Sequence, residues 1–185
     1  GKASQRLTYL KINPSLLFMA SFRLLIFGGT GLLMMPEMTG DGMGMSFLDA
    51  FFTATSASCV TGLIVVDTAT YFSDKGIALL MILIQLGGLN IISFASFFAA
   101  FSRKGVGLRH HTIIKDFMSY DSLSSTHSLL KRVVTLTLLI ESLGAVLIFL
   151  TWDYRTPFES LGQKIFFSVF HSISAFNNAG FSTFT

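Results

Sequence analysis

The side chains that most often carry chemistry are few in this sequence and are poorly placed for catalysis. The single cysteine, Cys59, has no base arranged beside it, so a thiolate nucleophile is not indicated. Three of the four histidines, His110, His111 and His127, share one basic stretch that contains no cysteine and no i, i+4 pair, which disfavours a zinc site. The sequence therefore supports neither an enzyme nor an organic cofactor.

A stronger chemical signal is a short helix followed by a loop that contains glycine. Residues 46–57 (SFLDAFFTATSA) predict a helix of about three turns, because Ser46 and Asp49 form a start that resembles a capping box. Residues 58–63 (SCVTGL) then combine poor helix formers with Gly62. A helix C-terminus is partly negative, and loop carbonyls are the hard oxygen ligands that replace water around an alkali cation. The pattern is typical of cation coordination by the backbone, and an amphipathic surface helix with an outer loop is the alternative.

The same pattern recurs after residue 164, in the segment KIFFSVFHSISAFNNAGFSTFT. The two copies are offset by 118 residues, the difference between positions 62 and 180. This offset also maps an apolar segment at 14–35 onto 132–153. The predicted unit is a span, a short helix, a glycine loop and a second span, and both copies have the same topology, so an axis along the membrane normal should relate them. The paired positions are Phe52 with Phe170, Ser56 with Ser174, Ala57 with Ala175 and Gly62 with Gly180.

The elements that must hold these loops are apolar enough to cross a membrane. Of the 185 residues, 51% are hydrophobic and only 12% are charged, and the mean hydropathy is +0.65. A globular domain carries roughly 25% charged residues, so the composition argues against a soluble domain. A disordered tail, a basic nucleic-acid-binding domain and a disulfide-stapled secreted module are excluded. The sequence predicts an all-α membrane protein with spans at Pro14–Met35, Gly76–Ser102 and Val133–Trp152.

The distribution of lysine and arginine predicts the orientation of these spans. Basic residues gather before the first span and in the connection between the second and third, whereas the other connections hold most of the acidic residues. By the positive-inside rule, the N-terminus and the connection 103–132 are cytoplasmic. The basic residues in these two regions are Lys2, Arg6, Lys11, Arg103, Lys104, Arg109, Lys115, Lys131 and Arg132.

Two charged residues, Arg23 and Glu141, interrupt the first and third spans at equivalent positions of the repeat. A lone charge at the bilayer centre costs about 2.5–3.5 kcal/mol on insertion scales, so both side chains are expected to turn inward. The hypothesis is that both find polar or charged partners, and their equal depth and opposite sign include a pairing with each other among the possibilities. The alternative is that each contacts separate backbone carbonyls or the short helices.

Three stretches of the chain resemble the Trk/Ktr/HKT superfamily of potassium transporters, and the bacterial TrkH and KtrB subunits look most similar. The resemblance implies four repeats of outer helix, pore helix and inner helix in one chain, arranged like a potassium channel. One departure is Asn90, where many relatives have glycine, and it leaves open how the second span packs there. The stretches are TSASCVTGLIVVDTATYF (Thr55–Phe72), IQLGGLN (Ile84–Asn90) and SAFNNAGFST (Ser174–Thr183).

The resemblance also implies which residues form the ion filter, chiefly through backbone carbonyls. Potassium is the implied transported substrate, because glycine at position 62 goes with potassium preference and serine there goes with sodium preference in plant relatives. The implied partners are a second copy of the subunit and cytoplasmic nucleotide-binding subunits of the TrkA/KtrA type, for which the connection 103–132 is a candidate docking surface. The filter residues are Cys59, Val60, Thr61 and Gly62 in the first copy, and Asn177, Asn178, Ala179 and Gly180 in the second.

The predicted organisation is a first repeat at 1–103, a cytoplasmic connection at 104–131 and the beginning of a second repeat at 132–185. About one and a half of four repeats are then present, and the remaining repeats of the same polypeptide are expected to pack against them. A multi-pass protein of the bacterial inner membrane that takes up potassium is the main hypothesis. The alternatives are a non-conducting membrane scaffold or assembly fragment, and a sodium-permeable relative.

Overall fold

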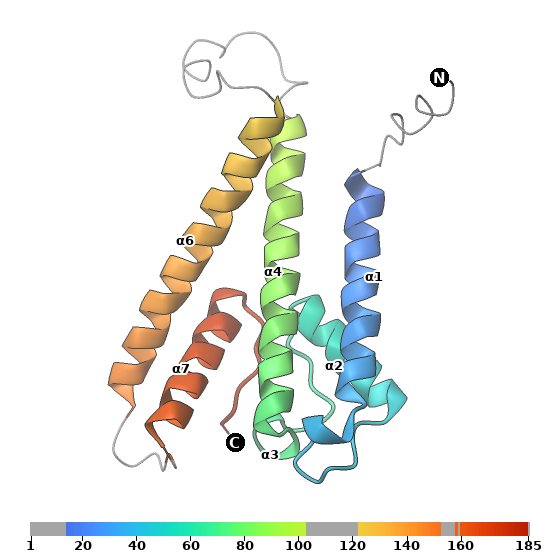
Figure 1. Ribbon diagram of the computed structural model, residues 1–185, viewed down its shortest axis with the longest axis vertical. Coiled ribbons are helices and arrows are strands. Elements are labelled where there is room, and N and C mark those ends of the chain that lie inside the picture. Colours follow the sequence, from blue (N-terminus) through green and yellow to red (C-terminus); the bar gives the residue numbers. More distant parts are fainter. Residues whose placement is uncertain (1–13, 103–121, 153–157, 159, 185) are drawn as a thin grey trace, which may run out of the picture.

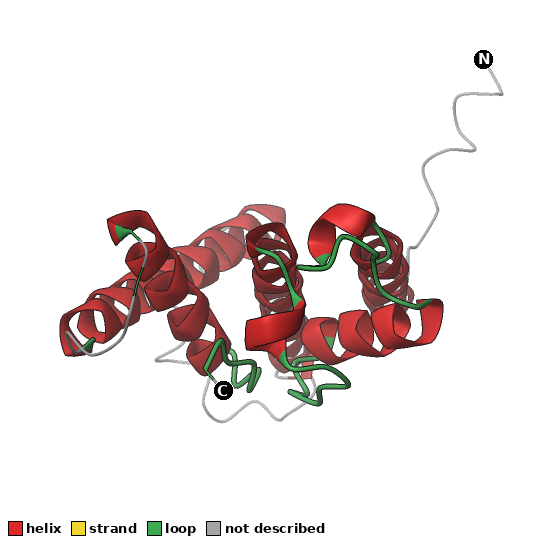
Figure 2. Ribbon diagram, turned by 90° about the horizontal axis from the view of Figure 1, so that it is seen from below, coloured by secondary structure: helices red, strands yellow, loops and turns green. Residues whose placement is uncertain are grey.

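The computed structural model describes residues 14–102, 122–152, 158 and 160–184. Within these ranges every named element is a helix, and Figure 2 shows only helices and loops. The two short helices, α2 and α7, both lie beside the same half of the long helix α4 (Figure 1). The helices are α1 (Pro14–Leu33), η1 (Pro36–Met38), α2 (Phe47–Ser58), α3 (Thr68–Tyr71), α4 (Asp74–Ser102), α6 (Ser122–Thr151) and α7 (Leu161–Phe176).

The predicted spans correspond to α1, α4 and α6, with one difference in length. Helix α6 begins at Ser122, well before the predicted span that starts at Val133, so it includes part of the predicted connection 104–131. Hydropathy marks only the apolar window of a helix, and the backbone hydrogen bonds continue beyond that window. By length and composition, α4 and α6 can each cross a membrane, whereas the apolar part of α1 described by the structure, Phe18–Leu33, is shorter.

Helix α2 begins as the sequence predicts. Ser46 is its N-cap, and the Ser46 Oγ accepts a hydrogen bond from the backbone N–H of Asp49 at 3.3 Å. The same hydroxyl donates to the carboxylate of Asp49 at 2.7 Å, so the two side chains are also joined directly, in place of the bond from the Ser46 backbone N–H that a full capping box has. Helix α7 uses Ser160 in the same role, with its Oγ accepting from the N–H of Gln163 at 3.2 Å.

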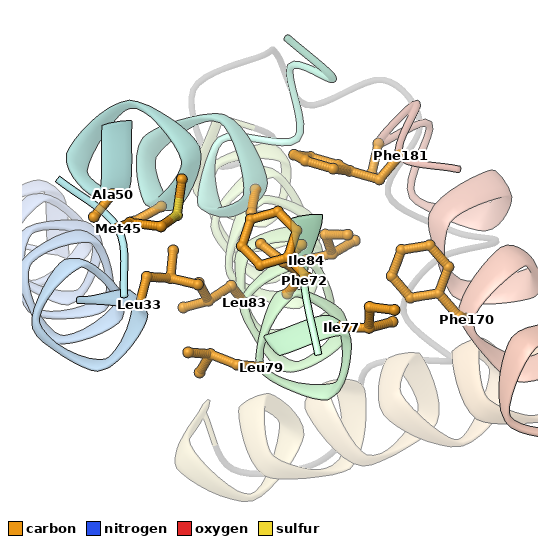
Figure 3. Packing of buried hydrophobic residues seen from close by; sticks show 14 residues of the cluster. Leu33, Met45, Ala50, Phe72, Ile77, Leu79, Leu83, Ile84, Phe170 and Phe181 are labelled. Carbon is orange, nitrogen blue, oxygen red and sulfur yellow. The ribbon is translucent and has the colours of Figure 1, made fainter. Parts of the chain in front are cut away.

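Helix α4 is the central element of the structure. It packs against α1 and α2 on one side and against α6 and α7 on the other (Figures 1 and 3). Of its apolar window, 44% is buried, compared with 11% for the apolar window of α6. The largest buried side chains include Leu80 and Ile84 of α4, Leu33 of α1 and Phe170 of α7. The core therefore surrounds α4, and the outer face of α6 consists mostly of exposed apolar side chains.

The connection from α1 to α2 is tied to the beginning of α4. The Ser73 Oγ donates a hydrogen bond to the carbonyl oxygen of Glu37 at 2.6 Å, and the Lys75 ammonium group donates to the Glu37 carboxylate. The hydrogen bond and the charge of Lys75 hold the pKa of Glu37 below its ordinary value. Gly76 lies against the carbonyl oxygen of Met38, where a Cβ would have no room. These contacts fix the end of the helical bundle that carries α2.

A test of this central packing is Gly87→Ala in α4, made in the full-length protein. A Cβ at position 87 would collide with the backbone carbonyl oxygen of Ser58, at the end of α2. We expect a loss of about 1–3 kcal/mol in stability, although alanine is the better helix former. Gly28→Ala in α1 is the matched control, because nothing lies within 4 Å of its Cβ position. Thermal unfolding in detergent measures both, and equal melting temperatures for the two variants would contradict the packing.

Candidate functional site

The turns that follow α2 and α7 have matching backbone hydrogen bonds. Cys59 N–H donates to the carbonyl oxygen of Thr55 at 2.8 Å, and Asn177 N–H donates to that of Ile173 at 3.1 Å. Each pair of equivalent atoms is separated by the offset of 118 residues found in the sequence. The next two backbone N–H to carbonyl bonds also match. The bond from Val60 to Ala57 (3.3 Å) corresponds to that from Asn178 to Ala175 (3.1 Å). The bond from Thr61 to Ser56 (2.9 Å) corresponds to that from Ala179 to Ser174 (2.7 Å).

Both turns reverse direction through left-handed backbone conformations. Val60 has a φ of 58° and Asn178 has a φ of 57°, and these are the non-glycine residues of the described chain with positive φ. Two residues later, Gly62 and Gly180 have φ values of 76° and 70°. Left-handed φ is costly for a branched side chain such as that of Val60, and such strain tends to persist at functional positions. The chain therefore maintains the same unusual turn in two places.

The two turns meet at their glycines. A Cβ placed on Gly62 would lie 2.6 Å from the carbonyl oxygen of Ala179 and 3.3 Å from the Cα of Gly180. A Cβ placed on Gly180 would lie 3.3 Å from the Cα of Gly62. Glycine is required at both positions for its conformation and for this close approach of two backbones. The structure thus brings the two predicted filter segments into contact, although 118 residues separate Gly62 from Gly180.

Serines near the C-terminal ends of α2 and α7 form hydrogen bonds with the turns that follow these helices. The Thr61 Oγ1 donates to the Ser56 Oγ at 3.1 Å in the first copy. In the second copy, the Ser174 Oγ donates to the carbonyl oxygen of Phe181 at 2.7 Å. Ser56 and Ser174 are equivalent in the repeat, and both are buried. The same position therefore anchors each turn, through a side chain in one copy and through the backbone in the other.

The arrangement suits a cation more than an anion. Each turn follows the C-terminus of a helix, where the last carbonyls lack intrahelical partners and the helix dipole is negative. The turn N–H groups of Cys59, Val60 and Thr61 donate back to carbonyls of α2, so they are not free to bind an anion. In the part of the chain that the structure describes, no group of three His, Cys, Asp or Glu side chains could hold a metal ion. The turns therefore offer a cation backbone carbonyls rather than a cluster of carboxylate, imidazole or thiolate ligands.

Two adjacent glycines of α4 support both turns, and sequence reasoning did not assign them a role. A Cβ on Gly87 would collide with the carbonyl oxygen of Ser58, and a Cβ on Gly88 would collide with the Oδ1 of Asn177. One turn of α4 therefore contacts the ends of both short helices. The run Leu86–Leu89 (LGGL) was recognised only as part of a family motif, since its partners are distant in sequence.

Asn90, the residue that departs from the family motif, joins α4 to α1. Its Nδ2 donates a hydrogen bond to the Ser21 Oγ at 2.7 Å. The Ser21 hydroxyl in turn donates to the carbonyl oxygen of Phe18 at 2.7 Å. The departure from glycine thus adds a polar contact between two long helices where the sequence alone left the packing open.

Glu141 and Arg23 do not pair with each other in the described structure. The Glu141 side chain lies at 6% exposure, and its two carboxylate oxygens accept from Gln85 Nε2 at 2.9 Å and from Asn177 Nδ2 at 3.3 Å. Arg23 is exposed, and no ion pair is found for it among the described residues. Glu141 therefore turns inward and finds polar partners, as expected, whereas Arg23 does not turn inward and the pairing of the two residues with each other is wrong.

His171 of α7 is packed and hydrogen-bonded. Its Nδ1 lies 2.7 Å from the carbonyl oxygen of Phe167, and its Nε2 accepts from the backbone N–H of Thr183 at 3.3 Å. The rings of Phe184 and Trp152 lie 4.7 Å and 6.0 Å from the imidazole. The histidine thus holds the segment that follows Gly180. His110 and His111 lie outside the described residues, and of His127 only the helical backbone is described.

Comparison with known proteins gives one family and several relatives. The family model TrkH, described as cation transport protein, matches residues 13–185. The potassium/sodium uptake protein NtpJ of Enterococcus hirae is 33% identical over 92% of this chain and 37% of its own length. The Ktr system potassium uptake protein B of Bacillus subtilis is 35% identical over 94% of this chain and 38% of its own length. The protein of the same name from Vibrio alginolyticus is 39% identical over 77% of this chain and 30% of its own length. The chain therefore spans about a third of the length of these relatives.

Alanine substitutions test the contact between the two turns in the full-length protein. Gly62→Ala forces an alanine into a left-handed backbone conformation and places its Cβ against the carbonyl oxygen of Ala179. We expect this variant to lose about 2–4 kcal/mol in stability. Gly180→Ala should cost less, because its nearest contact is 3.3 Å away. Gly42→Ala is the matched control, since Gly42 shares a positive φ of 69° but has nothing within 4 Å. Thermal unfolding should rank the losses in this order, and a control as damaging as Gly62→Ala would refute the contact.

Proposed function

Because this chain belongs to the TrkH family of cation transport proteins, we propose that it forms part of the membrane subunit of a Trk/Ktr-type potassium uptake system. Its two turns, at residues 59–62 and 177–180, are proposed as two of four segments that line a selectivity filter. The single observation that carries this proposal is the contact between Gly62 and Gly180, at the ends of two turns with the same hydrogen bonds. The named relatives take part in potassium or potassium/sodium uptake.

The proposed mechanism uses the backbone alone. A potassium ion exchanges its water for carbonyl oxygens at the turns, and the C-terminal ends of α2 and α7 add a favourable negative potential. The ion binds weakly enough to move on, so transport follows its electrochemical gradient. The strained turns are held by Ser56, Ser174 and the α4 glycines, so the oxygens are in place before the ion arrives. Preorganisation of this kind reduces the cost of binding.

The proposed selectivity is for potassium over sodium. It rests on glycine at position 62, which goes with potassium preference in the superfamily that the sequence resembles. A sodium-permeable pore is the second candidate, and the name of the Enterococcus relative, potassium/sodium uptake protein, favours it. Both candidates use the same filter segments and differ only in the relative uptake of the two ions.

The proposed assembly places the remaining repeats around the same axis. Residues 1–103 form a first repeat, 104–131 a cytoplasmic connection and 132–185 the outer helix, pore helix and filter segment of a second. The helix that begins at Ser122 extends the second outer helix toward the cytoplasm. A homodimer and nucleotide-binding gating subunits complete the proposed system, with the N-terminus and the connection on the cytoplasmic side. The names of the relatives, which place those proteins in a Ktr system, support only that this chain works within a membrane transport system.

Uptake of rubidium by potassium-starved cells tests the proposed filter. Cells that lack their own potassium uptake systems receive the full-length protein, either unchanged or with Gly62→Asp. We expect the variant to lose at least nine-tenths of rubidium uptake, roughly tenfold, because a carboxylate would block the narrow turn and bind the ion. Gly42→Asp is the control, since it places the same charge at an exposed glycine of positive φ. If Gly62→Asp at normal membrane abundance left uptake unchanged, the filter assignment would be wrong.

The preference between the two ions is tested by Gly62→Ser. We expect this variant to lower the ratio of rubidium to sodium uptake, because a side chain at position 62 disturbs the carbonyls that replace the larger ion's water. Uptake of labelled rubidium and sodium, measured side by side in the same cells, gives the ratio. A wild-type ratio near one would favour the sodium-permeable alternative.

A further inference from the structure

Behind the second turn, three polar side chains from three different elements form one network. Glu141 comes from α6, Gln85 comes from α4, and Asn177 is the C-cap of α7. Gln85 Nε2 donates to Glu141 Oε2 at 2.9 Å, and Asn177 Nδ2 donates to Glu141 Oε1 at 3.3 Å. Asn177 Nδ2 also lies 3.4 Å from Gln85 Oε1. Each side chain therefore contacts the other two.

The network is tied to the backbone of the same elements. Asn177 Nδ2 also donates to the carbonyl oxygen of Ile173, one turn earlier in α7, at 2.9 Å. The Ser172 Oγ donates to the carbonyl oxygen of Glu141 at 2.6 Å, which adds a buried bond between α7 and α6. On its other side, the Asn177 Oδ1 fills the space that Gly88 leaves open. The amide of Asn177 is thus fixed at both of its polar atoms.

The position of the carboxyl group is costly without these partners. Glu141 lies within the apolar stretch Lys131–Thr151, which is long enough to cross a membrane. A buried carboxylate needs strong hydrogen bonds, and here both of its oxygens are occupied by amide donors. Without Glu141, the half-buried amide of Gln85 would lose the acceptor of its Nε2, and Asn177 Nδ2 would keep its bond to Ile173 but lose its bond to α6. Glu141 therefore provides the bond that ties the Asn177 side chain to α6.

The first copy of the unit has no such network among the described residues. Cys59 stands at the position of Asn177, and Arg23 stands at the position of Glu141 and is exposed. The end of α2 is held instead by close packing of Ser58 against Gly87. The two turns share one backbone structure but differ in how they are supported.

We propose that Glu141 is a positioning residue for the ion filter. Through Gln85 and Asn177, it fixes the end of α7 and sets the place of the carbonyls that follow. It touches no ion, and its effect on selectivity passes through Asn177. This inference rests on the proposed function, because it assumes that the second turn lines the ion pathway.

The test compares ion selectivity in full-length variants that reach the membrane in equal amounts. Glu141→Gln keeps the size of the side chain but removes the charge and one acceptor oxygen. We expect the ratio of rubidium to sodium uptake to fall roughly tenfold, because a charge-assisted bond to Asn177 is lost. Ser142→Ala is the control on the same helix, since Ser142 is exposed and bonds only within α6, and it should leave the ratio unchanged.

Moving the carboxylate from position 141 to position 85 separates an effect on the position of Asn177 from a general loss of stability. In the double variant Gln85→Glu with Glu141→Gln, the charge moves to position 85, whose Oε1 already lies 3.4 Å from Asn177 Nδ2. We expect at least half of the lost selectivity to return. A double variant no better than Glu141→Gln would overturn the proposal, and so would a single variant with a normal ratio.

A second measurement applies if the Glu141 variants do not fold. Asn177→Ala breaks the same link from the side of the filter, and purified protein then reports the rise in melting temperature on adding potassium chloride or sodium chloride. We expect folded Asn177→Ala to lose the difference between the two salts, and an unchanged difference would overturn the proposal.

Gly62→Asp distinguishes failure of the proposed filter from failure of the positioning role. If Gly62→Asp has normal rubidium uptake, the proposed filter is wrong. If Gly62→Asp loses uptake but the Glu141 variants keep a normal ratio of rubidium to sodium uptake, only the positioning role is wrong.

Discussion

The backbone of a membrane protein cannot leave its N–H and carbonyl groups unpaired against lipid. Regular helices satisfy this constraint by themselves, but the turns after α2 and α7 do not, because their residues leave the helical conformation. Such turns are tolerated only where protein covers them or where they line a watery path. The arrangement of the other elements follows from this requirement. α4 covers both turns from one side, and their own N–H groups bond back to the preceding helix.

Coverage of this kind requires unusually small residues on α4. Gly87 and Gly88 let the ends of two short helices approach one helix within a single turn, and Gly29 of α1 packs against Leu83 one turn earlier. Bulky apolar residues occupy the neighbouring positions: Leu83 and Ile84 lie in the core (Figure 3), and Leu80 is also buried. Small residues that allow close approach are a usual device of helix packing in membranes. In this protein the same device brings backbone turns, rather than whole helices, against α4.

Sequence reasoning was most successful where the signal is local. The N-cap at Ser46 and the end of α2 near residue 57 depend on neighbouring residues. The offset of 118 residues is a different kind of signal, and the two turns that it pairs have matching hydrogen bonds. Sequence reasoning failed where partners are distant and uncharged. An inward position with polar or charged partners was expected for Glu141, but the partners themselves, Gln85 and Asn177, were not identified, because their amides carry no charge that would mark them. The early beginning of α6 at Ser122 was missed because polar residues extend a helix without raising its hydropathy.

The contact between Gly62 and Gly180 also has a consequence for the order of biosynthesis. Ribosomes add roughly 5–20 residues per second, so on the order of ten seconds separate the emergence of the two glycines. During that interval the first turn has α4 behind it but lacks its neighbour, because α6 and α7 have not yet been made. Long-range contacts of this kind form late, after the cost of closing the intervening loop has been met. The contact between the two turns therefore forms only after α7 has been made, and until then local hydrogen bonds and the packing of α4 must keep the first turn in its strained shape.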